Sequence, residues 1–137
     1  GDTTQKIESV ASDLSGSGYL VFYSNRTYGA IARLPERFPL SSGYYRMLFS
    51  GDLGYELVNS FSSYPWLLGV TFKDDPFSRA TVSVPALLQA KSSEPLTLNL
   101  GYADNDVITY DHPLVLIFRN TARFDSNYIL ALLLKSE

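Results

Sequence analysis

The residue types best suited to chemistry gather in one short run, Tyr110-Asp111-His112-Pro113. An aspartate can orient an imidazole as a general base, and Ser24 is a candidate nucleophile if the fold brings it near. Adjacent residues on an extended chain point to opposite faces, so Asp111 and His112 do not pair easily. The composition favours a turn. We therefore count Tyr110, Asp111 and His112 as candidate binding residues and keep a small hydrolase using His112 as an alternative.

A second polar stretch follows the apolar run at residues 19–23. Arginine grips phosphate or carboxylate through a bidentate fork, and ligands bind open α/β sheets at the carboxyl ends of parallel strands. If residues 19–23 form such a strand, the stretch after it is well placed to bind a ligand. The candidate binding residues here are Ser24, Asn25, Arg26, Tyr28, Arg33, Glu36 and Arg37.

The same stretch has a purely structural interpretation. Arg26 or Arg33 could pair with Glu36 or Asp52 and so tether a long loop. The residue types alone do not separate a tether from a ligand site.

Other familiar sites are missing from the sequence. It has no P-loop, GxGxxG, GxSxG or HExxH motif. Cysteine is absent and His112 is the only histidine, so the chain cannot build a thiolate or multi-histidine metal site by itself. The acidic spots Asp74-Asp75 and Asp104-x-Asp106 stand in turn-like sequence, where aspartate bonds the backbone. We expect no catalytic residue, metal or cofactor in this chain.

Charge and aromatic content narrow the partner classes. The formal net charge is −3 and the eleven Lys and Arg are dispersed, so the basic stripe of a nucleic-acid binder is absent. Ten tyrosines leave room for a carbohydrate-binding module, since a tyrosine ring offers an apolar face and a polar tip. Such a module would expose coplanar rings, for which Tyr44, Tyr64 and Trp66 are the candidates.

The size of the chain suits one soluble domain, residues 1–137. Met47 is the only methionine, so we expect a piece cut from a larger protein. The apolar stretch at 128–134 is far below the roughly 20 residues that span a bilayer.

The first half of the chain predicts two helices and two strands. Apolar residues at 7, 10, 11 and 14 predict a helix capped by Thr3 or Thr4 and stopped at Gly16 or Gly18. A helix capped by Ser41 or Ser42 should end at Gly51 or Gly54. The strands are residues 19–23, buried on both faces, and 55–61. Strand, helix and strand in this order predict a parallel βαβ unit.

The second half is less regular. We expect short strands at 68–72 and 97–100, a hairpin of 107–110 with 114–118, and a last helix from Asp125 or Ser126 to about Lys135. Residues 85–89 could form one or two helical turns, but Pro76, Pro85 and Pro95 favour an irregular stretch. The fold class is therefore α/β: a single domain whose mixed, mostly parallel sheet carries helices on its faces, with a C-terminal hairpin and helix.

A string of motifs in fixed order gives the chain a family likeness over about residues 19–121. The domain resembles the soluble extracytoplasmic region that follows the membrane helices in bacterial proteins similar to dolichyl-phosphate-mannose protein mannosyltransferases. The motifs are Tyr23-Ser-Asn-Arg-Thr-Tyr-Gly29, Arg33-Leu-Pro-Glu-Arg-Phe-Pro-Leu40, Tyr44-Tyr45, Leu48-Phe-Ser-Gly51, Leu53-Gly-Tyr-Glu-Leu-Val58, Phe61-x-Ser63-Tyr-Pro65, Tyr110-Asp-His-Pro113 and Val115-Leu-Ile-Phe118.

The resemblance implies a parent that transfers a sugar from a polyprenyl-phosphate carrier at the extracytoplasmic face of the cell membrane. In such enzymes the acidic residues that drive transfer lie on a loop between membrane helices, and no residue here takes that role. The chain is then a non-catalytic accessory domain. Its partners would be the membrane-embedded remainder of the parent and a glycan or polyprenyl-phosphate sugar.

Overall fold

The computed structural model describes residues 3–64, 66–73, 77, 81–91, 97–101 and 114–135. These ranges contain five helices and six strands in two small sheets, which confirms a mixed α/β fold. The helices are α1 (Thr4–Gly16), α2 (Arg26–Ile31), α3 (Pro39–Ser50), α4 (Ala86–Lys91) and α5 (Ser126–Leu134). The strands are β1 (Tyr19–Phe22), β2 (Tyr55–Phe61), β3 (Trp66–Leu67), β4 (Val70–Lys73), β5 (Thr97–Asn99) and β6 (Val115–Asn120).

The first and last helices form as their sequences predict. Thr3 caps α1 by accepting a hydrogen bond from the Lys6 backbone N–H, and the helix buries one apolar stripe of Ile7, Ala11 and Leu14. In α5 the Asp125 carboxylate accepts from the Tyr128 N–H at 3.0 Å. Both caps satisfy backbone donors that a helix start leaves without intrahelical partners.

Helix α3 ends as predicted but starts differently. It stops at Gly51, whose φ of 90° is the left-handed conformation that glycine adopts without steric cost. Its start is Pro39, which needs no N–H partner in the first turn. The predicted cap at Ser41 or Ser42 is therefore wrong, and the Ser42 hydroxyl instead donates to the Ile31 carbonyl at 2.9 Å.

The main sheet has the order β1-β6-β2, and both of its strand pairs are antiparallel. The predicted parallel pairing of β1 with β2 is wrong, because β6 lies between them and neither strand pairs with the other. The expectation that residues 24–37 follow the carboxyl end of a parallel strand is wrong for the same reason, since β1 pairs antiparallel with β6. Both edges of β6 are occupied, by β1 over residues 116–119 and by β2 over residues 115–120. The other half of the expected hairpin, residues 107–110, lies outside the described residues.

Strand β1 is not covered on both faces, contrary to the prediction from its continuous apolar run. Tyr19 and Val21 are 60% and 56% exposed, whereas Leu20 and Phe22 pack against the core. An antiparallel sheet can leave one face to solvent, and tyrosine and valine suit a pleated surface whether or not it is covered. The apolar run therefore predicted a strand correctly, but the prediction that both faces of this strand are buried was wrong.

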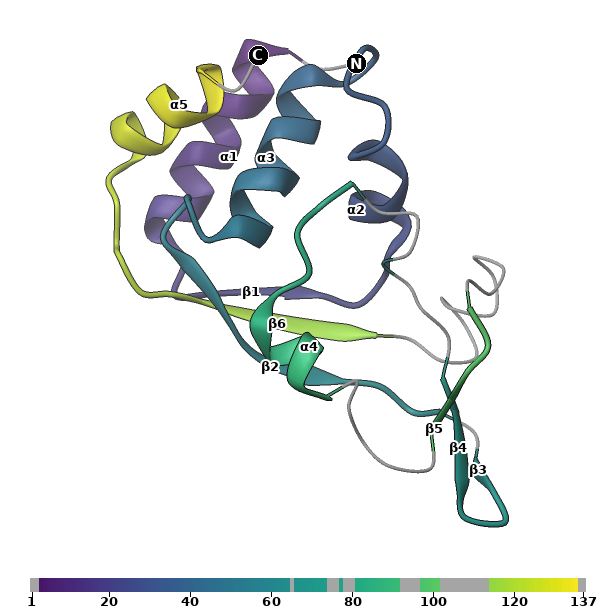
Figure 1. Cartoon of the computed structure of the whole chain (residues 1–137). Coiled ribbons are helices and arrows are strands. Elements are labelled where there is room, and N and C mark those ends of the chain that lie inside the picture. The colour runs from purple at the N-terminus through teal and green to yellow at the C-terminus, as the bar shows by residue number, and fades with distance from the viewer. Residues whose placement is uncertain are drawn as a thin grey trace.

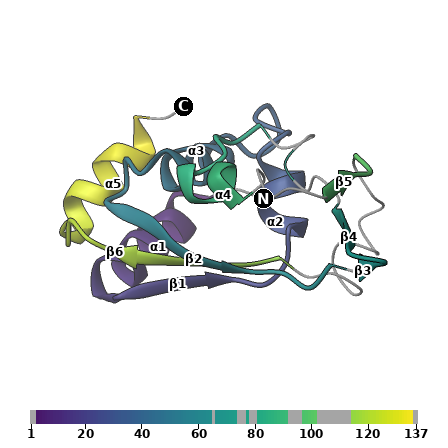
Figure 2. The same ribbon diagram turned by 60° about the horizontal axis from the view of Figure 1, so that its bottom comes forward.

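The core lies between one face of this sheet and a layer of helices. Figure 1 shows α1, α3 and α5 together on that face, and Figure 2 shows the same arrangement from a view turned by 60°. Leu116 and Phe118 of β6 are buried beneath the helices, and Phe22, Phe49 and Phe118 form edge-to-face ring pairs. This core fixes the position of α3, whose residues Tyr45, Leu48 and Phe49 are buried in it.

The second sheet is small and lies away from the helix layer (Figure 1), with the order β3-β4-β5. The strand expected at 68–72 begins only at Val70, because Leu68 and Gly69 form a turn with positive φ values. Strands β3 and β4 pair antiparallel on either side of this turn. Strands β4 and β5 are parallel. The parallel pairing expected of the main sheet thus occurs only here within the described ranges.

Candidate functional site

The arginine-bearing stretch of residues 24–37, here called the basic segment, consists of a short helix and hydrogen-bonded turns and is not an open loop. Residues 26–31 form α2, and the chain then makes tight turns closed by hydrogen bonds from the Arg33 N–H to the Ala30 carbonyl and from the Arg37 N–H to the Leu34 carbonyl. These bonds restrict where the arginine side chains can reach.

Two side chains from other parts of the chain hold the basic segment in place. Ser42 of α3 donates to the Ile31 carbonyl, and Thr81 donates to the Ala32 carbonyl next to it. Backbone carbonyls at a helix end lack intrahelical donors, so the two hydroxyls satisfy groups that would otherwise need water. The segment is thereby fixed both to α3 and to the stretch around Thr81.

Three arginines of the basic segment are exposed: Arg26, Arg33 and Arg37. Glu36 is exposed as well, so three positive groups and one negative group give the segment a local formal charge of +2 on a chain whose net charge is −3. The Arg37 guanidinium lies 5.3 Å from the centre of the Phe38 ring, within the range of a cation–π contact. That contact orients Arg37 without neutralising it.

The tether that the sequence allowed for Arg33 does not form in the described structure. In the described structure no ion pair joins Arg33 to Glu36 or to Asp52, and one Asp52 carboxylate oxygen accepts instead from the Ser50 hydroxyl at 2.6 Å. Arg33 therefore keeps its charge directed to solvent.

The remaining candidate residues of this segment, Ser24, Asn25 and Tyr28, are half-buried or buried. Asn25 is buried, and Ser24 accepts from the Arg26 N–H at 3.2 Å. Tyr28 is fully buried, stacked on Phe77 at 5.6 Å and tilted against Phe49 at 5.1 Å. Burial, with a smaller contribution from Tyr64, raises the pKa of Tyr28 well above its usual value. Tyr28 thus anchors α2 in the core beneath the arginines.

The run Tyr110-Asp111-His112 lies outside the described residues. Its role as a binding or catalytic group remains a prediction. Within the described residues no group of three or more His, Asp or Glu side chains is arranged to hold a metal ion.

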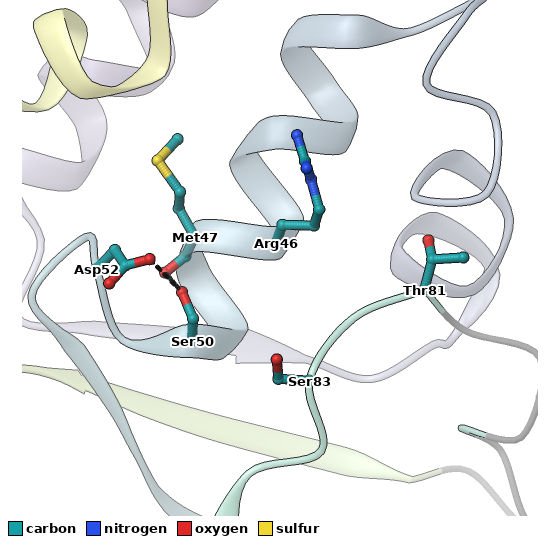
Figure 3. Close-up of a pocket in the computed structure, with 6 residues that line it drawn as sticks. All are labelled: Arg46, Met47, Ser50, Asp52, Thr81 and Ser83. Carbon is teal, nitrogen blue, oxygen red and sulfur yellow. Dashed lines mark hydrogen bonds between the residues drawn. The ribbon is translucent and has the colours of Figure 1, made fainter. Parts of the chain in front are cut away.

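A second feature, which the sequence did not single out, is a surface hollow of about 380 Å³ beside α3. Figure 3 shows its walls: α3 and the turn after it on one side, and the strap at residues 81–83 on the other. We call it the polar hollow, and its lining residues are Arg46, Met47, Ser50, Asp52, Thr81 and Ser83.

Local structure explains how these side chains meet. Arg46 and Ser50 are four residues apart on α3 and so share a face, and the left-handed turn at Gly51 brings Asp52 back beside Ser50. Thr81 is fixed by its bond to Ala32, which holds the strap against the basic segment. The i, i+4 spacing of Arg46 and Ser50 was visible in the sequence, but nothing there indicated that residues 81–83 would cross α3.

Of the three candidate rings for a carbohydrate platform, the structure describes the side chains of two, Tyr44 and Tyr64. Tyr44 is half-buried against Tyr45, with ring centres 4.8 Å apart, and burial raises its pKa. Tyr64 is also only partly exposed. The side chain of Trp66 lies outside what the structure describes.

No family model, no curated protein and no solved structure matches this chain. Among the described helices, none combines the length and the apolar character needed to cross a bilayer.

Proposed function

We propose that this chain is a non-catalytic, extracytoplasmic accessory domain of a polytopic membrane glycosyltransferase. In this role the basic segment binds the phosphate group of a polyprenyl-phosphate sugar carrier. The observation that carries the proposal is that Arg33 and Arg37 are both exposed on one short segment of the chain. Hydrogen bonds from Ser42 and Thr81 hold the backbone of this segment in place. The motif resemblance over residues 19–121 supplies the parent enzyme, and this part rests on the likeness alone.

The chemistry of arginine supports a phosphate as the target. A guanidinium group stays charged at any physiological pH and matches phosphate geometry with two parallel N–H donors. Each arginine held near an anionic membrane surface contributes about 1 kcal/mol of attraction. A fixed pair would therefore contribute about 2 kcal/mol, or roughly 30-fold in partitioning.

Vesicle binding tests this proposal directly. The domain is incubated with phosphatidylcholine vesicles that contain undecaprenyl phosphate, and the bound fraction is compared with that on phosphatidylcholine alone. We expect binding only to the phosphate-bearing vesicles, weakened by added salt because exposed charges are screened. The variant Arg33→Gln/Arg37→Gln should bind roughly 10- to 30-fold more weakly.

The matched control is Lys6→Gln/Arg119→Gln, which also removes two positive charges from exposed positions but leaves the basic segment intact. Equal losses in the two double variants would mean that net charge alone drives binding and would contradict the proposal. Binding of the unaltered domain to neutral vesicles would contradict it as well. Reading the genomic sequence upstream of this chain tests the parentage: many hydrophobic spans are expected there.

A further inference from the structure

The polar hollow lies next to the basic segment but differs from it in charge. Its lining carries one guanidinium group, from Arg46, and one carboxylate, from Asp52. These two formal charges cancel, so the walls attract neither anions nor cations on balance, which suits a ligand without net charge. The hollow therefore differs in expected ligand from the arginine pair at residues 33 and 37.

Hydroxyl groups dominate the rest of the lining. Ser50 donates to one oxygen of Asp52 and leaves the second carboxylate oxygen able to accept. The Thr81 hydroxyl donates to Ala32 and keeps its lone pairs for a ligand donor. Ser83 is exposed and forms no hydrogen bond in the described structure, so it can both donate and accept.

Among the described residues that line the hollow, Met47 is the one apolar residue. Met47 is half-buried and packs against the hydrophobic core, and Figure 3 shows its side chain pointing away from Thr81 and Ser83. A volume of about 380 Å³ is within the range of roughly 300–1,000 Å³ seen for small-molecule sites. The hydroxyls, one carboxylate and one guanidinium of the lining match a ligand rich in hydroxyl groups, such as a sugar ring.

We propose that the polar hollow binds a neutral sugar ring, with Asp52 and Ser83 bonding the hydroxyls of the sugar from opposite walls. This site is separate from the basic segment, and the proposal does not rest on the function proposed above. Thr81 joins the two regions, since it lines the hollow and also holds Ala32 beside Arg33.

The test is a two-dimensional amide NMR titration of the whole chain with a panel of neutral methyl glycosides. At least one glycoside should give saturable shifts centred on residues 46–52 and 81–83. Sodium phosphate at the same concentrations should not reproduce them. Asp52→Asn and Ser83→Ala should each weaken binding, by at least tenfold for the charged acceptor and by roughly three- to tenfold for the hydroxyl.

Matched controls are Asp13→Asn and Ser12→Ala, which make the same chemical changes at exposed positions on α1. These variants should bind like the unaltered chain. The proposal is overturned if no glycoside in the panel saturates, if phosphate produces the same shifts, or if Asp52→Asn and Ser83→Ala bind as tightly as their controls. Arg33→Gln/Arg37→Gln should leave glycoside binding unchanged, which separates this site from the basic segment.

Discussion

Tyr55 and Asn120 face each other across strands β2 and β6, and both donate hydrogen bonds to the carbonyl oxygens of Leu14 and Ser17. The Tyr55 hydroxyl lies 2.7 Å from the Leu14 oxygen, and the Asn120 amide nitrogen lies 3.0 Å from the Ser17 oxygen. These carbonyls belong to the end of α1, where intrahelical donors run out. The pair therefore fastens the first helix to the main sheet.

Removing either member of this pair should destabilise the fold. Tyr55→Phe leaves Asn120 to serve both carbonyls and should lower the free energy of unfolding by about 1–2 kcal/mol. Asn120→Ala should cost about 2–3 kcal/mol, because the Arg123 N–H also loses its acceptor. Urea unfolding measures both values. Tyr19→Phe, at an exposed position, is the control, and a loss equal to that of Tyr55→Phe would refute the role of the bond.

The substitution Tyr28→Phe should not lower the free energy of unfolding, in contrast to Tyr55→Phe. Its hydroxyl is buried and has no hydrogen-bond partner in the described structure. An unsatisfied buried hydroxyl costs about 1–3 kcal/mol, so Tyr28→Phe should leave stability unchanged or raise it by about 1 kcal/mol. A clear loss of stability in urea would show that the hydroxyl has a partner in solution.

Gly54 stands where the chain cannot accept a side chain. Its φ is +76°, and an added Cβ would lie 2.6 Å from the Cβ of Ala122. Its carbonyl also accepts from the N–H groups of Thr121 and Ala122, so the backbone cannot shift freely. Gly54→Ala should cost more than about 2 kcal/mol.

The control for this prediction is Gly16→Ala. Gly16 is the last residue of α1, and an added Cβ there meets nothing within 4 Å. Because alanine favours helix over glycine, this variant should be neutral or more stable by up to about 1 kcal/mol. Thermal unfolding of the two variants gives the comparison, and similar melting temperatures would contradict the argument.

Alkaline pH should unfold the domain through its buried tyrosines. Burial raises the pKa of Tyr28, Tyr44, Tyr45 and Tyr55 above the ordinary value of 10.0. The unfolded chain then loses these protons at lower pH than the folded chain does. Stability should therefore be constant below about pH 9 and fall as the pH rises through 10 and above. Urea midpoints between pH 8 and 11 test this, and a flat profile would contradict it.

The ends of α1, the start of α5 and the end of α3 could be predicted because their signals are local. The Thr3 and Asp125 caps and the stop at Gly51 depend on residues within a few positions of each other. The order of the main sheet could not be predicted in this way. Nothing within residues 19–23 or 55–61 indicates that β6, more than fifty residues later, inserts between them.

The two candidate sites also differ in whether local sequence could predict them. The arginines of the basic segment were visible as a local cluster, although not the short helix that carries Arg26. The polar hollow was not, because its two walls come from residues 46–52 and 81–83 and meet only through the tertiary fold. Ser83 looks unremarkable in sequence, and its position across from Asp52 is what makes it a candidate ligand contact.

The central claim is that Arg33 and Arg37 together bind a lipid-linked phosphate. The most direct measurement is an NMR titration of the arginine Nε–Hε signals with geranyl phosphate, a short soluble prenyl phosphate. We predict saturable shifts of the Arg33 and Arg37 signals, with those of Arg119 and Arg123 unchanged. Equal shifts at all four arginines, or none at Arg33 and Arg37, would contradict the account.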